Sequence, residues 1–204
     1  MLRQQLLRYN RSMRIAIPVL LCLFAGCSGE EPVGWHELDL GILEVDGDLG
    51  GRVLTADGAR ADLFNRLSGR LQEAVAADGP VHAIGVCRDE APGFAAAVGE
   101  RFGLTIGRTG VRLRNPVNAG PEWAADAIAA QATRKRAWLH SDGRLGVLTP
   151  IQTALTCLVC HGTAETLGPG VADALAEHYP ADAATGFAEG DLRGWFWVEI
   201  PAAD

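Results

Sequence analysis

Two cysteines and a histidine near residue 160 form the most specific chemical pattern in the sequence. Cys157 and Cys160 are separated by two residues, and His161 follows directly. Thiols at this spacing reach the two vinyl groups on one edge of a porphyrin, and the adjacent imidazole then lies under the ring, aimed at the iron. The motif therefore predicts one covalently attached c-type haem, with His161 as an iron ligand.

Three other interpretations of the cysteine pair fit the surrounding sequence less well. A thioredoxin-type redox pair would stand between a strand and a long helix in a βαβ unit, which this segment does not predict. A structural zinc would require a second close pair of ligands. The sequence provides only His178 and Cys87, which are far apart from each other. A disulfide between Cys157 and Cys160 would close a small strained ring.

The second iron ligand is less certain from the residues alone. Methionine is excluded, because Met1 and Met13 both lie in a segment that export would remove. A Cys87 thiolate would stabilise ferric iron and lower the reduction potential, although a free cysteine is more often a small buried apolar residue. His82 is the alternative; on a strand it and Cys87 would face opposite sides, so only one could reach the iron. The remaining candidates are His36, His140, His178 and an open site.

Three arginines follow one another closely in an otherwise acidic chain. Arg108, Arg112 and Arg114 lie within seven residues. Haem propionates need cationic partners, and a guanidinium binds a carboxylate through paired donors. We therefore expect these arginines to contact the haem, with a solvated strand face paired to surface acids as the competing interpretation.

Composition sets the class of protein. The chain has 204 residues, 48% of them hydrophobic, with 25 acidic and 18 basic residues and a net charge of −7. This length predicts one folded domain with a sizeable core, and the negative charge excludes nucleic acid as a partner. Apart from the haem motif, nothing in the sequence resembles a set of catalytic residues, so we predict that the protein is not an enzyme.

The first residues predict export and a lipid anchor. A basic start is followed by eleven apolar residues at 15–25, too few to span a membrane. The sequence 23–27 resembles a bacterial lipobox, which predicts a signal peptide at 1–26 and lipidation of Cys27. Ser28 favours the outer membrane. Ordinary cleavage, which would leave a soluble periplasmic protein, is the alternative; either way the protein lies on the periplasmic side.

The elements that position the motif are predicted from hydrophobic spacing and turn residues. The sequence favours an α+β domain over 58–204, built on an antiparallel sheet, with 27–57 as the anchored N-terminus and tether. We expect helices at 59–77, 91–102, from Pro121, and at 171–178. We expect strands at 81–87, 104–113, 136–140, 144–149 and 191–201.

Taken together, these segments resemble a family of exported single-haem c-type domains with a PAS-like fold, formerly a domain of unknown function. The similarity covers about residues 59–201. Its marks are at 83–87, 91–92, 108–109, 112–118, 123, 149–151, 157–162, 179–182, 184, 186 and 190–194. The resemblance implies that His161 and Cys87 both bind the iron.

The motif and this resemblance predict a periplasmic lipoprotein that works as a low-potential electron-transfer cytochrome. Two protein ligands would leave no open position on the iron, which argues against oxygen chemistry. The alternative is a haem-based redox or gas sensor in which Cys87 is displaced. The sequence identifies no redox partner protein and leaves a homodimer open.

Overall fold

A computed structural model describes residues 33–41 and 47–203, and these described residues form one compact unit. The predicted signal peptide and the predicted lipidation site, Cys27, lie outside the described residues. The strands are β1 (Trp35–Leu38), β2 (Thr105–Gly110), β3 (Arg136–His140), β4 (Leu145–Gln152) and β5 (Leu192–Ile200). The α-helices are α1 (Asp48–Gly85), α2 (Ala91–Phe102), α3 (Ala125–Ala129), α4 (Leu158–His161) and α5 (Val171–His178).

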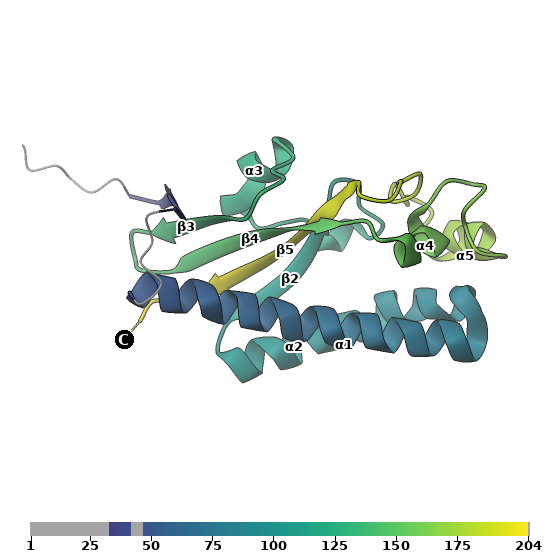
Figure 1. Ribbon diagram of the computed structural model, residues 1–204, viewed down its shortest axis with the longest axis horizontal. Coiled ribbons are helices and arrows are strands. Elements are labelled where there is room, and N and C mark those ends of the chain that lie inside the picture. The colour runs from purple at the N-terminus through teal and green to yellow at the C-terminus, as the bar shows by residue number, and fades with distance from the viewer. Residues whose placement is uncertain (1–32, 42–46, 204) are drawn as a thin grey trace, which may run out of the picture. The chain divides into compact units, whose positions relative to one another are not determined.

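The strands form one antiparallel sheet in the order β1-β3-β4-β5-β2 (Figure 1). The hairpin of β3 and β4 pairs Arg136 with Leu148, and β5 lies between β4 and β2. The predicted α+β class and the four strands from 104 onward are confirmed. Strand β1 was not predicted: it lies in the segment assigned to the tether and forms one edge of the sheet.

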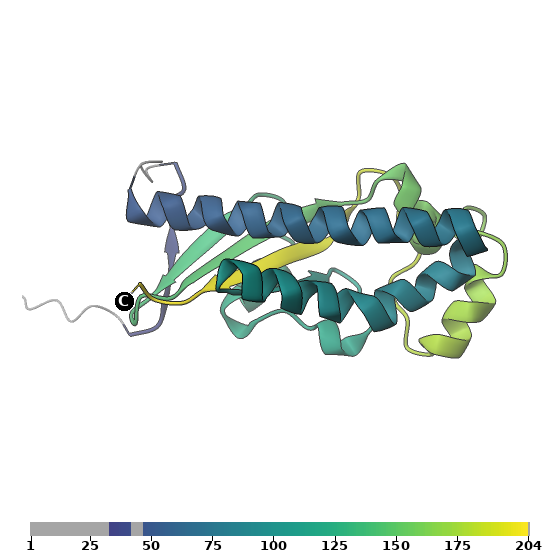
Figure 2. The same ribbon diagram turned by 90° about the horizontal axis from the view of Figure 1, so that it is seen from below.

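One face of the sheet is covered by a helical hairpin (Figure 2). Helix α1 is interrupted at Gly79, whose φ of 82° and ψ of 176° are not helical, and Pro80 lies directly after the break. The chain then runs back through a π-helical turn, Val86–Glu90, into α2, which ends at Gly103 in the left-handed conformation. Glycine tolerates that conformation without steric cost, which explains why the helix ends there. The predicted helix at 91–102 is confirmed.

The predicted strand at 81–87 is wrong, because this segment is helical. Proline is favoured at the first position of a helix, so Pro80 starts a new helix and is not the boundary before a strand. A short apolar run cannot by itself distinguish a buried strand from a buried helix. The opposite-face argument for His82 and Cys87, which assumed strand geometry, therefore does not hold.

The domain boundary at residue 58 is also corrected. Helix α1 begins at Asp48 and β1 pairs with β3, so residues 35–38 and 48–57 belong to the folded domain. The predicted helix at 171–178 is confirmed as α5. The predicted helix from Pro121 is confirmed as a short 3-10 turn (Glu122–Ala124) that leads into α3, with Pro121 just before its start.

The two faces of the sheet bury different side chains. Phe196 and Val198 of β5 pack with Leu63 and Leu67 of α1 in the core between sheet and helices. The opposite face carries all five tryptophans of the chain, in one cluster with Leu148 and the helical turns at 122–129. The two tryptophans of β5, Trp195 and Trp197, belong to this second cluster, so the predicted alternation along the strand is confirmed.

Candidate functional site

The cysteine motif lies just beyond the end of β4, on two short helical turns (Figure 1). A 3-10 turn (Leu155–Cys157) leads directly into α4, which holds Cys160 and His161. Cys87, Cys157 and Cys160 are all free thiols, and each is partly buried. Because Cys157 and Cys160 form no disulfide here, their thiols are available for other chemistry.

The His161 ring is oriented by the backbone. Its Nδ1 lies 2.7 Å from the carbonyl oxygen of Ala184. Arg114 Nη2, a donor, lies farther from the same Nδ1, at 3.3 Å. Because a carbonyl only accepts and its contact is the shorter one, we assign the proton to Nδ1, which leaves the Nε2 lone pair free. Burial lowers the pKa of His161 to about 3, with the charges of Arg193 and Arg114 adding to the effect. A neutral imidazole anchored through Nδ1 to a carbonyl is the form in which histidine binds metals.

Arg114 connects the motif to the loop that holds His161. Its Nε donates to Asp182 Oδ2 at 3.2 Å, and its Nη2 donates to the carbonyl oxygen of Cys160 at 2.6 Å. Asp182 accepts a second hydrogen bond from the Ala184 N–H at 2.8 Å. The Arg114 and Asp182 side chains are only 10% and 9% exposed. This buried ion pair fixes the position of the Ala184 carbonyl, and through it the His161 ring.

Cys87 lies on the π-helical turn of the returning helix, and its side chain is partly buried. Burial raises the pKa of the Cys160 thiol, and the thiols of Cys87 and Cys157 raise it further, so each of these two thiols is within electrostatic range of Cys160. Burial, and next the Cys87 thiol, also raises the pKa of Tyr179. The structure therefore brings Cys87 to the same end of the molecule as the motif, although 70 residues separate them in sequence.

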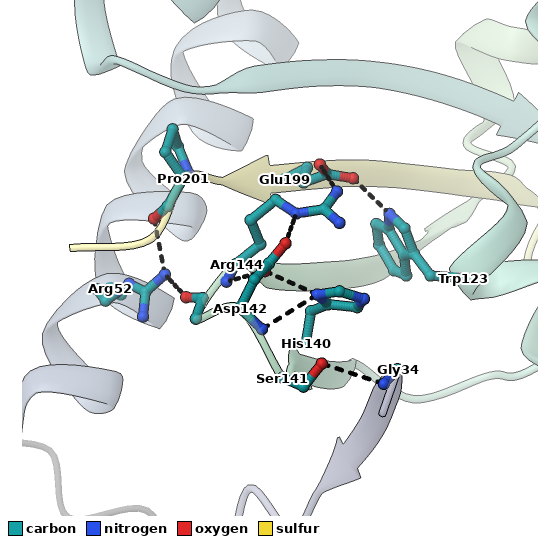
Figure 3. A network of polar contacts seen from close by, with 10 residues as sticks. Gly34, Arg52, Trp123, His140, Ser141, Asp142, Arg144, Glu199 and Pro201 are labelled. Carbon is teal, nitrogen blue, oxygen red and sulfur yellow. Dashed lines mark hydrogen bonds and ion pairs between the residues drawn. The ribbon is translucent and has the colours of Figure 1, made fainter. Parts of the chain in front are cut away.

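His82, the alternative ligand, lies on the outside of the helical hairpin. Its side chain is 55% exposed, and its Nε2 is 3.8 Å from Asp78 Oδ2. This position favours Cys87 over His82 as the partner of the motif. The His140 ring lies 2.7 Å from Asp142 (Figure 3). It stands at the hairpin between β3 and β4, at the opposite end of β4 from the motif. His36 lies on β1 and His178 in the last turn of α5.

One arginine that was not predicted from the sequence carries the strongest sign of a missing partner. Arg193 is a partly buried residue near the start of β5, and its Nε is buried with no hydrogen-bond partner in the part of the chain that the structure describes. Its Nη1 donates to the Arg112 carbonyl oxygen at 3.3 Å. Burial lowers its pKa to about 10, with Arg114 and Arg108 adding to the effect. An unpaired buried N–H on a cation is an available donor for an anionic group.

The three predicted arginines play different parts. Arg114 uses its donors on the protein, as described above. Arg112 is exposed, and its guanidinium carbon lies 4.0 Å from the centre of the Phe187 ring. Arg108 lies on β2, where it is partly buried, and its charge acts on both His161 and Arg193. Strand pairing of β2 with β5 brings Arg193 into this group, and no sequence pattern predicts that pairing.

This set of side chains fits a haem better than a bare metal ion. Among the described residues, no group of three or more His, Cys, Asp or Glu side chains is arranged to hold a metal ion. A porphyrin supplies four nitrogen ligands itself and needs two from the protein at most. One oriented imidazole, the thiol of Cys87 at the same end of the molecule, two further thiols and an unpaired guanidinium match a group with an iron, two vinyls and two carboxylates.

Comparison with known proteins agrees with the fold. A family model described as Tll0287-like matches residues 53–201. A crystal structure of the cyanobacterial haem protein Tll0287 superposes with a TM-score of 0.54 at 22% sequence identity, and the match covers 77% of this chain and 96% of that one. No curated protein matches. Within the described residues, none of the helices combines the length and the apolar character that a membrane span requires.

Proposed function

The chain belongs to the Tll0287-like family, and from this premise we propose that it is a c-type haem protein. Cys157 and Cys160 would hold the haem through thioether bonds, and His161 would bind the iron. The proposal is supported by the cysteine motif, by the free thiols, and by the similarity of the fold to a cyanobacterial haem protein. The single observation that carries it is the orientation of the His161 ring, whose Nδ1 lies 2.7 Å from the Ala184 carbonyl oxygen and whose Nε2 is left for the iron.

Cys87 would be the second protein ligand of the iron. Its place on the π-helical turn, within electrostatic range of Cys160, supports this choice over the exposed His82. A thiolate ligand stabilises ferric iron, so this ligand pair favours a low reduction potential. The unpaired Nε of Arg193 is the best placed donor for a propionate, with Arg108 and Arg112 nearby. Arg114 is a positioning residue for His161.

A bound haem would supply one-electron redox chemistry. The residues of this chain would hold it by both axial positions, which suits an electron carrier that does not transform a substrate. We propose that the carrier is an exported lipoprotein, attached by Cys27 to the periplasmic side of a bacterial membrane. The PAS-like description of the fold belongs to this proposal.

The test is a visible spectrum of the full-length protein, matured in a host with a haem-attachment system. We expect a low-spin haem spectrum, and pigment that stays with the protein in acidified acetone. The double variant Cys157→Ala/Cys160→Ala should lose all covalent haem. Colourless protein, or pigment that the solvent extracts from the unsubstituted chain, would overturn the proposal. Cys22→Ala, in the predicted signal peptide, is the matched control and should change nothing.

The backbone at Cys87 favours a second candidate function, a redox or gas sensor. Cys87 lies within the only π-helical turn of the described residues, and such turns occur frequently at functional sites. A sensor would release the Cys87 side chain when a gas binds. Stopped-flow mixing of the reduced protein with carbon monoxide separates the two functions, because fast saturable binding supports the sensor and absent binding supports the carrier.

A further inference from the structure

A cavity of about 490 Å³ opens on the tryptophan-bearing face of the sheet, and the haem proposal does not involve it. Its lining includes the rings of Trp35, Trp123 and Trp138. The Trp35 and Trp123 ring centres are 5.4 Å apart, and those of Trp123 and Trp138 are 5.3 Å apart, with all three rings tilted. The volume lies in the range of pockets that bind small molecules.

The position of the central ring is set by the strands beneath it. A Cβ atom at Gly146 would meet three Trp123 ring atoms at 3.0 Å, so the ring lies directly over this glycine of β4. The Trp123 indole N–H donates to Glu199 Oε2 at 2.9 Å, and Glu199 in turn accepts from Arg144 at 2.9 Å (Figure 3). Trp138 of β3 is the register partner of Gly146. The rings are thus held in place without a ligand.

The polar part of the cavity is negative. Glu37, Glu122, Asp126 and Arg136 all line it, which leaves an excess of two negative charges. Arg136 is paired through two contacts with Glu37. Glu122 and Asp126 are exposed, and neither takes part in the ion pairs found among the described residues. Their charge therefore remains available at the mouth of the cavity.

The same rings already accept positive charge from the protein. The guanidinium carbon of Arg136 lies 5.6 Å from the centre of Trp138, and that of Arg144 lies 5.2 Å from the centre of Trp35. No such contact is found for Trp123 among the described residues. Aromatic faces with nearby carboxylates attract cations, and methylated ammonium groups are bound best because water holds them weakly.

We propose that this cavity binds a quaternary ammonium group, with Trp35, Trp123 and Trp138 as its walls and with Glu122 and Asp126 providing the charge. The ligand is a small organic cation of the trimethylammonium type, either free or as a lipid headgroup. Trp35 lies outside the residues that match the family model, whereas Trp123 and Trp138 lie within them.

The test is calorimetric titration of the mature protein with choline, alongside its neutral isostere 3,3-dimethyl-1-butanol. We expect saturable binding of choline and at least tenfold weaker binding of the alcohol. Trp123→Leu and the double variant Glu122→Gln/Asp126→Asn should each weaken choline binding at least tenfold. The second variant changes only exposed side chains, so it keeps the test valid if the tryptophan variant fails to fold.

A matched control removes the same charge from another surface. Glu100→Gln/Asp173→Asn alters two exposed acids on α2 and α5, and it should leave choline binding unchanged. Three results would overturn the proposal: no saturable binding, equal binding of the alcohol, or an equal loss in the control variant. The haem spectrum gives an independent readout, because failure of the haem proposal would change the spectrum and leave choline binding intact.

The source of the ammonium group is distinguished with vesicles. Phosphatidylcholine vesicles should co-sediment the protein purified without its lipid if the site accepts a headgroup, and free choline should then release it. Phosphatidylglycerol vesicles, which lack the ammonium group, are the control. Choline binding without vesicle binding assigns the site to a free cation.

Discussion

The two ends of the sheet are built in different ways. At the motif end, the chain leaves β4 and continues in short turns, and the geometry of His161 depends on one carbonyl and one buried ion pair. The other end of the sheet carries the cavity lined by Trp35, Trp123 and Trp138, and we call it the tryptophan end. There the rings of Trp123 and Trp138 lie over regular strands whose register fixes their spacing. The first end concentrates reactive side chains on irregular backbone, and the second builds a shaped surface on regular backbone. Changes at one end should therefore leave the other intact.

The largest effect is expected at the proposed second axial ligand. Cys87→Ser should keep the haem covalently attached, because the thioethers are elsewhere. The reduction potential should rise by a sizeable part of the roughly 0.8 V range that axial ligands control, and the ferric spectrum should change. Potentiometric titration measures the reduction potential, and absorbance spectroscopy measures the ferric spectrum. If both stay the same, Cys87 is a packing residue; choline binding at the other end should not change in either case.

The next effect tests the ion pair that positions His161. Arg114→Met should lower the free energy of unfolding by about 3 kcal/mol, because it leaves the buried Asp182 carboxylate without its cationic partner and removes the donor to Cys160. Urea unfolding measures the loss. Arg101→Met, which breaks an exposed pair with Asp62, is the control and should have a much smaller effect. Equal losses in the two variants would show that Arg114 does not hold the motif end together.

A smaller effect is expected beneath the tryptophans. Gly146→Ala places a methyl group against the Trp123 ring and should cost about 1–2 kcal/mol of stability. The haem spectrum should be unchanged, and choline binding should weaken because the central ring is displaced. Gly51→Ala, at an open position in α1, should instead be neutral or slightly stabilising. A Gly146→Ala protein with unaltered stability and choline binding would show that the ring is free to move.

The smallest effect concerns acid stability at the tryptophan end. Hydrogen bonds from the Arg144 backbone and side chain, and from His140, lower the pKa of Asp142 to about 2. The carboxylate therefore contributes stability above its usual pKa of 3.8, and this contribution is lost as the pH falls towards 2. Asp142→Asn should flatten the fall of the melting temperature between pH 4 and 2. A fall as steep as that of the unsubstituted chain would contradict this role.

The same contrast explains what the sequence could predict. The alternation of β5, the hairpin of β3 and β4, and the end of α2 at Gly103 depend on local patterns, and all were predicted. The segment 81–87 was not, because a short apolar run after Pro80 fits a strand or a helix equally well locally. The segment is helical because its apolar side chains pack against α5 and against the earlier part of α1.

The residues of the two sites also differ in whether local sequence patterns could predict them. The motif residues could be selected from spacing alone, since a chemical group of fixed size imposes that spacing. Arg193 could not, because its burial and its unpaired Nε depend on the pairing of β2 with β5. The tryptophan cavity could not be predicted either: Trp35, Trp123 and Trp138 come from three separate segments that only the sheet register and the turns at 122–129 bring together.

The helical position of Cys87 has a mechanical consequence. Cys87 belongs to the returning arm of the hairpin. His161 lies 74 positions later in the sequence, after β4. If both hold one iron, the cofactor becomes a cross-link that closes a long loop of the chain. By analogy with a disulfide, closing a loop of this size removes enough freedom from the unfolded chain to be worth about 4 kcal/mol. The prosthetic group would then hold the helical hairpin to the motif segment. Breaking the bond to Cys87 would open this loop, whereas loss of the His161 bond alone would not, because Cys157 and Cys160 would still hold the haem.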